Sequence, residues 1–225
     1  MRSLIRWSIS VAAAIVLAAG VARADGFRLL EISGFQVKWG KPAMGQGAEI
    51  TYGFATTAAA YPDVLKCPTL APADRLAAAI GGDTARLEAI AAAAFDLWSA
   101  AADIGFRSAA AGETPDILIG AQGQPDHIAF ANVWHDRGRA AKGVAPLTRA
   151  VICLNPGLHW AAGRPRAGTV DLGTVLAHEI GHAIGLDHPG PTGALMGYRD
   201  QGDLDRLMAG DIAGARLLYG APRTR

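Results

Sequence analysis

Residues 178–188 read HEIGHAIGLDH, and the interpretation of the whole chain starts from this stretch. His178 and His182 are four residues apart, so on an α-helix both side chains lie on one face and can reach one ion. Gly185 would end this helix, because glycine adopts the left-handed backbone that helix C-termini often need. The reversed chain would then bring His188 to the same ion. Three histidines and one open position are typical of a catalytic zinc, so the stretch predicts one zinc site.

Glu179 directly follows the first predicted ligand. It would project beside the metal, where a carboxylate can hold a water molecule and accept its proton. We therefore predict that Glu179 is a general base. The alternative is a structural helix whose histidines align by accident, and the number of fixed positions in the stretch argues against it.

Apolar residues at helical spacing predict three main helices. Asp83 would cap the first, and the motif helix would begin at Thr169 or Asp171 and run to Ile184. The third covers residues 209–219. Each of the three is long enough to bury one apolar face.

Short alternating or apolar segments predict strands at residues 50–54, 105–108, 116–120, 127–134 and 149–155. The Pro- and Ala-rich segment 58–82 is predicted to be a long loop with one helical turn. Strands mixed with a few helices in this order indicate the α+β class, with one twisted mixed sheet and three main helices packed on it.

Residues 1–24 have the pattern of a secretory signal peptide. Arg2 and Arg6 precede an apolar run, and the small residues Ala22 and Ala24 mark a cleavage site. An uncleaved anchor helix is the alternative, but the apolar run is short for a membrane span. We expect a single domain at residues 25–225, secreted or periplasmic after cleavage and without a membrane anchor.

The chain of 225 residues has a formal net charge of only +1, and three of its 21 basic residues fall in the leader. Such a balance gives no basis for a nucleic-acid partner or an anionic membrane surface. We expect a monomer.

The HExxHxxGxxH pattern resembles the signature of the metzincin metalloproteases. Met196, which follows His188, is similar to the Met-turn methionine that forms an apolar floor beneath the ligands of this clan. Lys38-Trp39, Ile50-Thr51-Tyr52 and residues 211–220 resemble parts of a matrixin catalytic domain. The resemblance implies a metzincin-like fold, one catalytic zinc and hydrolysis of peptide bonds in a protein or peptide substrate. Calcium is not supported by any motif.

The chain departs from matrixins where they hold a structural zinc, because Phe130 and Cys153 stand where histidines are expected. We hypothesise that Cys67 and Cys153 form a disulfide that ties the long loop to the sheet in place of this metal. Two unpaired thiols are the alternative, and a Cys67 thiolate at the zinc is another. The segment after Ala24 is short for the inhibitory pro-segment of matrixins, so none is expected.

Two features after the third histidine are more similar to serralysins and astacins. Pro189-Gly190 follows His188, and Tyr198 lies two residues after Met196. In those branches a tyrosine at this spacing approaches the zinc. Tyr198 is therefore predicted to be a fifth ligand or a transition-state donor, or else only a wall of the pocket.

The resemblance also implies where a substrate binds. It would lie extended along an edge strand near residues 149–155, with Val175 and residues 196–199 walling the main pocket. The predicted function is that of a secreted zinc endopeptidase. The rival is a secreted module that keeps the fold for binding with little turnover, and the presence of Glu179 and all three histidines argues against it.

Overall fold

A computed structural model describes residues 26–64, 66–190, 193–198 and 206–223 of the chain. Within this part, four helices are present: α1 (Asp74–Ala79), α2 (Thr84–Ala101), α3 (Leu172–Ala183) and α4 (Ala209–Tyr219). One 3-10 turn, η1, covers Arg137–Arg139. The predicted signal peptide lies outside the described residues, as does Arg199 of the predicted pocket wall.

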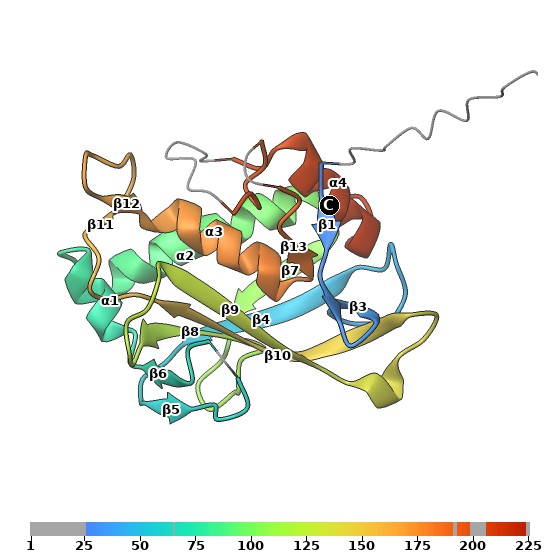
Figure 1. Cartoon of the computed structure of the whole chain (residues 1–225), viewed down its shortest axis with the longest axis horizontal. Coiled ribbons are helices and arrows are strands. Elements are labelled where there is room, and N and C mark those ends of the chain that lie inside the picture. Colours follow the sequence, from blue (N-terminus) through green and yellow to red (C-terminus); the bar gives the residue numbers. More distant parts are fainter. Residues whose placement is uncertain (1–25, 65, 191–192, 199–205, 224–225) are drawn as a thin grey trace, which may run out of the picture.

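Nine strands of the described part form one mixed sheet. They are β2 (Glu31–Ile32), β3 (Phe35–Lys38), β4 (Ala48–Phe54), β5 (Ala59–Ala60), β6 (Thr69–Ala71), β7 (Ile104–Ser108), β8 (Ile117–Gln122), β9 (Ala129–His135) and β10 (Val144–Leu154). Two small pairs lie apart from it: β1 (Arg28–Leu29) with β13 (Leu186–Asp187), and β11 (Trp160–Ala161) with β12 (Val170–Asp171). Helices α2 and α3 lie together on one face of the sheet (Figure 1). The predicted α+β class with three main helices is confirmed, α1 being a short addition.

The strand order corrects one prediction, the identity of the edge strand beside the motif helix. The main path runs β2-β3-β10-β8-β4-β7, and β9 pairs only with β10 among the described strands. Residues 149–155, expected at the edge, therefore belong mainly to an interior strand, and β9 is the edge. Ile152 packs in the core beneath the helices, whereas Val151 and Cys153 pack in a second cluster on the other face. A strand buried on both faces is typical of a sheet interior.

Side-chain caps start the two long helices where the sequence placed them. Asp83 accepts a hydrogen bond from the Arg86 N–H, and Asp171 accepts one from the Thr174 N–H. Of the two cap candidates for α3 the structure therefore uses Asp171. The indole Nε1 of Trp98 in α2 donates to the Ala177 carbonyl of α3 at 2.9 Å, which joins the two helices inside the core.

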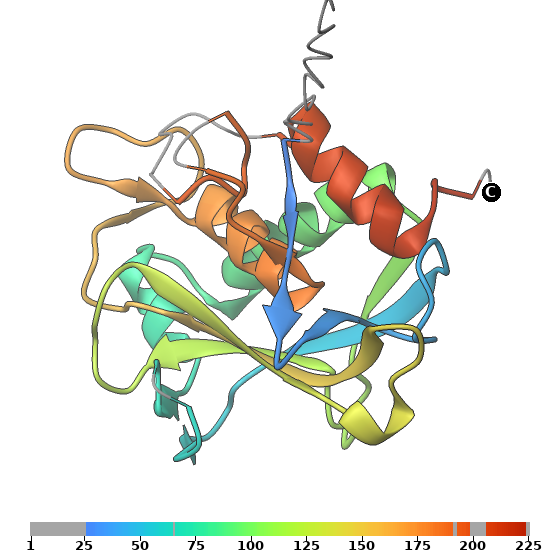
Figure 2. The same cartoon turned by 45° about the vertical axis from the view of Figure 1, so that its right-hand side comes forward.

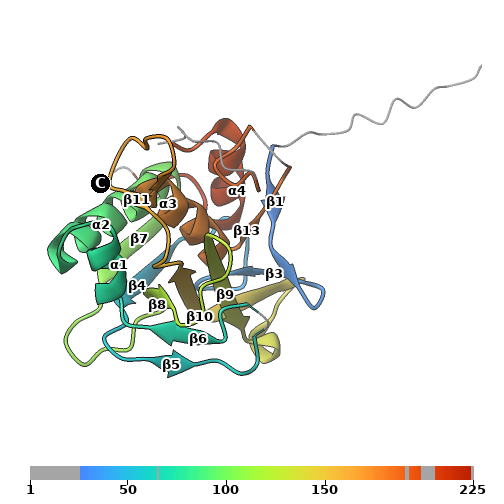
Figure 3. The same ribbon diagram turned by 60° about the vertical axis from the view of Figure 1, so that its left-hand side comes forward.

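The helical turn predicted within residues 58–82 is present as the short helix α1, but the prediction of a loop for the rest was wrong, because the segment also contains β5 and β6. Pro68 and Pro72 gave the loop signal, yet they flank β6 and leave its backbone free to pair with β8 and β5. Figure 3 shows β5 and β6 on the side of the sheet away from α3. They cover the second apolar cluster.

Cys67 and Cys153 are joined in a disulfide, with Cα atoms 6.5 Å apart. The bond links the segment before β6 to the interior strand β10 and lies within the second cluster. It closes 86 residues of sequence. This covalent link restrains the layer that backs the edge strand.

The first part of the domain contains three strands that the sequence did not indicate. Strands β1, β2 and β3 precede residue 50, and β1 pairs with β13 just beyond the motif helix. Figure 2 shows β1 running past the end of α3. The Leu30 N–H donates to the Gly185 carbonyl at 2.8 Å, so this N-terminal strand contacts the turn that follows the helix.

Replacing both cysteines by alanine should lower the free energy of unfolding by about 2–4 kcal/mol, because the unfolded chain regains the freedom that the bond removes. Urea denaturation of the metal-free protein measures this change. Reduced wild-type protein is the control, and its urea midpoint should equal that of the double variant. An unchanged urea midpoint in the variant would show that the bond adds no stability.

Candidate metal centre

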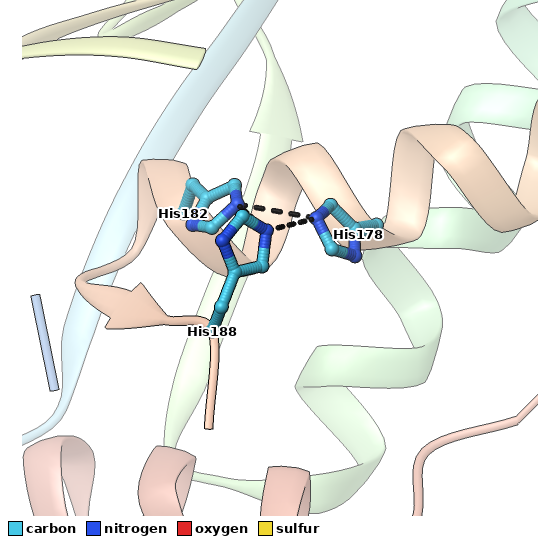
Figure 4. A group of neighbouring side chains, drawn as sticks. All are labelled: His178, His182 and His188. Atoms are coloured by element: carbon cyan, nitrogen blue, oxygen red, sulfur yellow. Dashed lines mark hydrogen bonds between the residues drawn. The ribbon is translucent and has the colours of Figure 1, made fainter. Parts of the chain in front are cut away.

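The three predicted ligands meet at one point of the structure. His178 and His182 project from α3, and His188 follows β13 (Figure 4). Each pair of their Nε2 atoms is separated by 3.1 Å. This is the one group of three metal-ligating side chains found among the described residues.

The remaining ring nitrogens of two histidines fix how these side chains present their Nε2 atoms. His178 Nδ1 lies 2.7 Å from the Leu195 carbonyl oxygen, and His182 Nδ1 lies 2.9 Å from that of Leu186. A carbonyl only accepts, so each Nδ1 carries the hydrogen and each Nε2 offers a lone pair. The contact between these two Nε2 atoms then contains no hydrogen. A cation at the centre would satisfy the lone pairs, so the donor set fits a zinc ion.

Burial keeps the three rings in the form that binds metal. It lowers the pKa of His182 to about 3 and also lowers the pKa values of His178 and His188. In each case desolvation is the largest cause, because a charged imidazolium loses hydration in the interior. The rings are therefore neutral near pH 7, as zinc requires.

Glu179 is buried beside this group, with 6% of its surface exposed. Its Oε2 has no hydrogen-bond partner among the described residues, and burial raises the pKa of its carboxyl to about 8. A nearby divalent cation has the opposite effect and favours the carboxylate. An unpartnered carboxyl group next to three converging imidazoles is the arrangement expected of a base that acts on a ligand.

The three histidines and Glu179 line one cavity of about 520 Å³. Val175 of the motif helix lines it as predicted, together with Gly197 and Tyr198. The first residues of β9 line the opposite wall. His127 also lines the cavity, which the sequence did not indicate, because nothing in its spacing relates it to the motif. His135 and His159 are not among the lining residues.

Tyr198 lies at the rim of this cavity. Its side chain is 58% exposed, and its ring packs edge-on against the His188 ring with centroids 6.1 Å apart. Phe130 packs against the His127 ring, with ring centroids 5.6 Å apart. The ammonium group of Lys66 lies over this phenyl ring, 5.2 Å from its centroid.

Met196 lies beneath α3 and is 2% exposed. A Cβ atom at Gly181 would collide with its sulfur, so glycine is required for the close approach of helix and methionine. Asp211 of α4 holds this turn, because its carboxylate accepts hydrogen bonds from the N–H groups of Leu195 and Met196. The sequence placed Asp211 in the last helix but did not reveal this role. An acid in the first turn of a mostly apolar helix was the available signal.

Elements distant in sequence hold the end of the motif helix. Trp39 Nε1 donates to the Ala183 carbonyl at 2.8 Å, and the Tyr219 hydroxyl donates to the Ile184 carbonyl at 2.7 Å. Gly185 has φ +104°, and a Cβ atom there would collide with a backbone carbonyl of β3. The turn toward His188 is therefore held from β3 and α4.

Comparison with known proteins assigns the family. The matrixin family model matches residues 79–220, which is more than half of the chain and includes all three histidines. The chain belongs to the matrixin family. Matrix metalloproteinase-19 of Mus musculus is 32% identical over 136 residues, which cover 59% of this chain and 25% of the relative. The macrophage metalloelastase of Oryctolagus cuniculus is 33% identical over 137 residues, covering 57% and 28%.

This matrixin thus spans about a quarter of the length of the curated relatives it matches. Its family binds zinc, and the three-histidine group is the place where the described chain can hold a metal ion. Among the described residues, no helix combines the length and apolar character needed to cross a membrane.

Replacing Tyr219 by phenylalanine should destabilise the protein by about 1–3 kcal/mol, because the Trp39 N–H and the Ile184 carbonyl lose their shared buried partner. Thermal and urea unfolding measure the loss. Tyr198→Phe is the matched control, since that side chain is mostly exposed. Equal stability of the two variants would contradict the anchoring role of Tyr219.

Proposed function

We propose that this matrixin is a zinc-dependent endopeptidase that acts outside the cytoplasm. The observation that carries the proposal is the convergence of His178, His182 and His188 beside the unpartnered carboxyl group of Glu179, in a cavity open to a substrate. Membership in a family of metalloproteases supports the reaction class. Export through the signal peptide at residues 1–24 and action as a monomer are parts of the same proposal.

In this mechanism the three histidines hold one zinc ion through their Nε2 atoms. Zinc held there would supply Lewis-acid chemistry, which lowers the pKa of a bound water toward neutrality and polarises a scissile carbonyl. Glu179 orients the attacking water, accepts its proton and then delivers that proton to the departing amine. The Leu195 and Leu186 carbonyls keep two of the rings in the tautomer that this arrangement needs.

The edge strand β9 is the proposed docking site for the substrate backbone. Residues 129–131 of this strand line the cavity, and β9 has β10 as its one partner among the described strands. An extended peptide can add to such a free edge through backbone hydrogen bonds, while side-chain pockets provide preference. The disulfide-linked layer behind β9 would keep this edge rigid.

Tyr198 is proposed to wall the substrate cavity next to the third ligand. Its exposure and its edge-on contact with the His188 ring favour a packing role over that of a fifth ligand or transition-state donor. The ring would limit solvent access to His188.

Replacing Glu179 by alanine should leave zinc binding intact and reduce peptide hydrolysis by about 10²–10⁴-fold, because the base is lost while the ligands remain. Elemental analysis tests whether the variant keeps its zinc, and cleavage of a fluorogenic peptide library tests the loss of hydrolysis. Glu88→Ala, a change on the exposed face of α2, is the control and should retain activity. A Glu179→Ala protein with normal turnover would refute the mechanism. Zinc-loaded wild type without any cleavage would favour the binding-module alternative.

Tyr198→Phe should change kcat by less than about threefold, because a wall residue acts through its ring and the hydroxyl is the group removed. Tyr198→Ala should raise KM more than it lowers kcat. Steady-state kinetics on one cleaved peptide distinguish the roles. A tenfold loss of kcat in Tyr198→Phe, at constant KM, would instead assign the hydroxyl to the transition state.

A further inference from the structure

The third ligand is held differently from the other two. The Nδ1 atoms of His178 and His182 each bond to a backbone carbonyl, which fixes their rings. His188 Nδ1 has no such partner among the described residues and lies 4.0 Å from Asp187 Oδ1, beyond hydrogen-bond distance. A hydrogen bond that positions this residue from the described part of the chain therefore has to act through its backbone.

Asp187 supplies that backbone restraint. Its Oδ1 accepts a hydrogen bond from the His188 N–H at 2.8 Å. Its Oδ2 lies 3.0 Å from Arg28 Nε. One carboxylate thus links the backbone of a metal ligand to a guanidinium group on another strand.

Strand pairing places Arg28 where it can make this contact. Arg28 and Asp187 are direct partners in the antiparallel pair of β1 and β13. The Leu30 N–H donates to the Gly185 carbonyl at the beginning of the same turn. The N-terminal strand therefore contacts both ends of the short segment that leads from α3 to His188.

We propose that Arg28 and Asp187 are positioning residues of the metal centre, which act on the metal through His188. This inference rests on the proposed zinc site. By holding the His188 backbone, the pair keeps the third Nε2 at the meeting point of the other two and slows its departure from the ion. Partners of metal ligands commonly contribute about 10–100-fold to metal affinity.

The two residues contribute unequally. The Asp187 side chain is 25% exposed and contacts the ligand's backbone directly, whereas Arg28 is 68% exposed. Exposed ion pairs are weak and are screened by salt, so the contribution of Arg28 is several times smaller and depends on ionic strength.

Zinc release into excess chelator, measured on the full chain after zinc loading, tests the proposal. Asp187→Ala should release zinc about tenfold faster than wild type or more. Arg28→Gln should release it about threefold faster at low salt. Asp187→Asn keeps an oxygen for the His188 N–H and should resemble Arg28→Gln. The double variant Arg28→Gln/Asp187→Asn should release zinc no faster than either single variant, because each single substitution already removes the same ion pair.

The chain contains a closely matched control pair, Arg223 and Asp103. Its Nε–Oδ2 distance is 2.7 Å, and its side chains are 72% and 24% exposed. Arg223→Gln therefore removes a similar ion pair without contact to a predicted ligand. It should lower the melting temperature of the metal-free protein about as much as Arg28→Gln does, while zinc release stays at the wild-type rate. High salt should raise the zinc-release rate of the wild type to nearly that of Arg28→Gln, and it should leave the release rate of Arg28→Gln unchanged.

Equal zinc-release rates for wild type, Asp187→Ala and Arg28→Gln would overturn the positioning role but would not contradict the zinc site. Faster zinc release from Arg223→Gln would also overturn the positioning role, since loss of an ion pair away from the ligands would then have the same effect. A wild-type protein that takes up no zinc would overturn the metal centre itself, and this inference with it.

Discussion

The Nε2 atoms of three imidazole rings meet 3.1 Å from one another, with the lone pairs of the His178 and His182 rings facing this point, and the rest of the fold serves to keep them there. Such an arrangement is unfavourable without a cation, because burial removes the water that would otherwise solvate the nitrogens. The same burial keeps the rings neutral and raises the pKa of Glu179, whose Oε2 has no hydrogen-bond partner within the described part of the chain. Metal affinity and the readiness of the base therefore share one cause, which is the burial of these side chains at the base of the cavity.

The protein meets this constraint by fixing the motif helix at several points that are remote in sequence. Trp98 joins it to α2, while Trp39, directly after β3, and Tyr219 of α4 hold its last carbonyls. Asp211 fixes the turn that carries Met196 beneath the helix. Because these anchors bond to backbone groups, they restrain the helix and turns without contacting the ion.

The sequence predicted those parts of the site whose cause is local. Helical spacing placed His178 and His182 on one face, side-chain caps fixed the helix starts, and Gly185 marked the turn. The parts it missed depend on contacts between distant segments. Strands of two residues, such as β1 and β13, are too short to show a periodic pattern. The pairing of Arg28 with Asp187 could therefore not be predicted from the sequence. The edge strand was assigned wrongly although the apolar run from Ala150 to Leu154 is typical of a strand buried on both faces.

If three histidines hold a zinc ion with one position left open, the zinc ligands can be counted by X-ray absorption at the zinc edge of the purified, zinc-loaded wild-type protein. We expect a first coordination shell of three imidazole nitrogens at about 2.0–2.1 Å and one oxygen from solvent, with no sulfur. A shell containing sulfur, or one completed by a fourth protein ligand without a solvent oxygen, would contradict it.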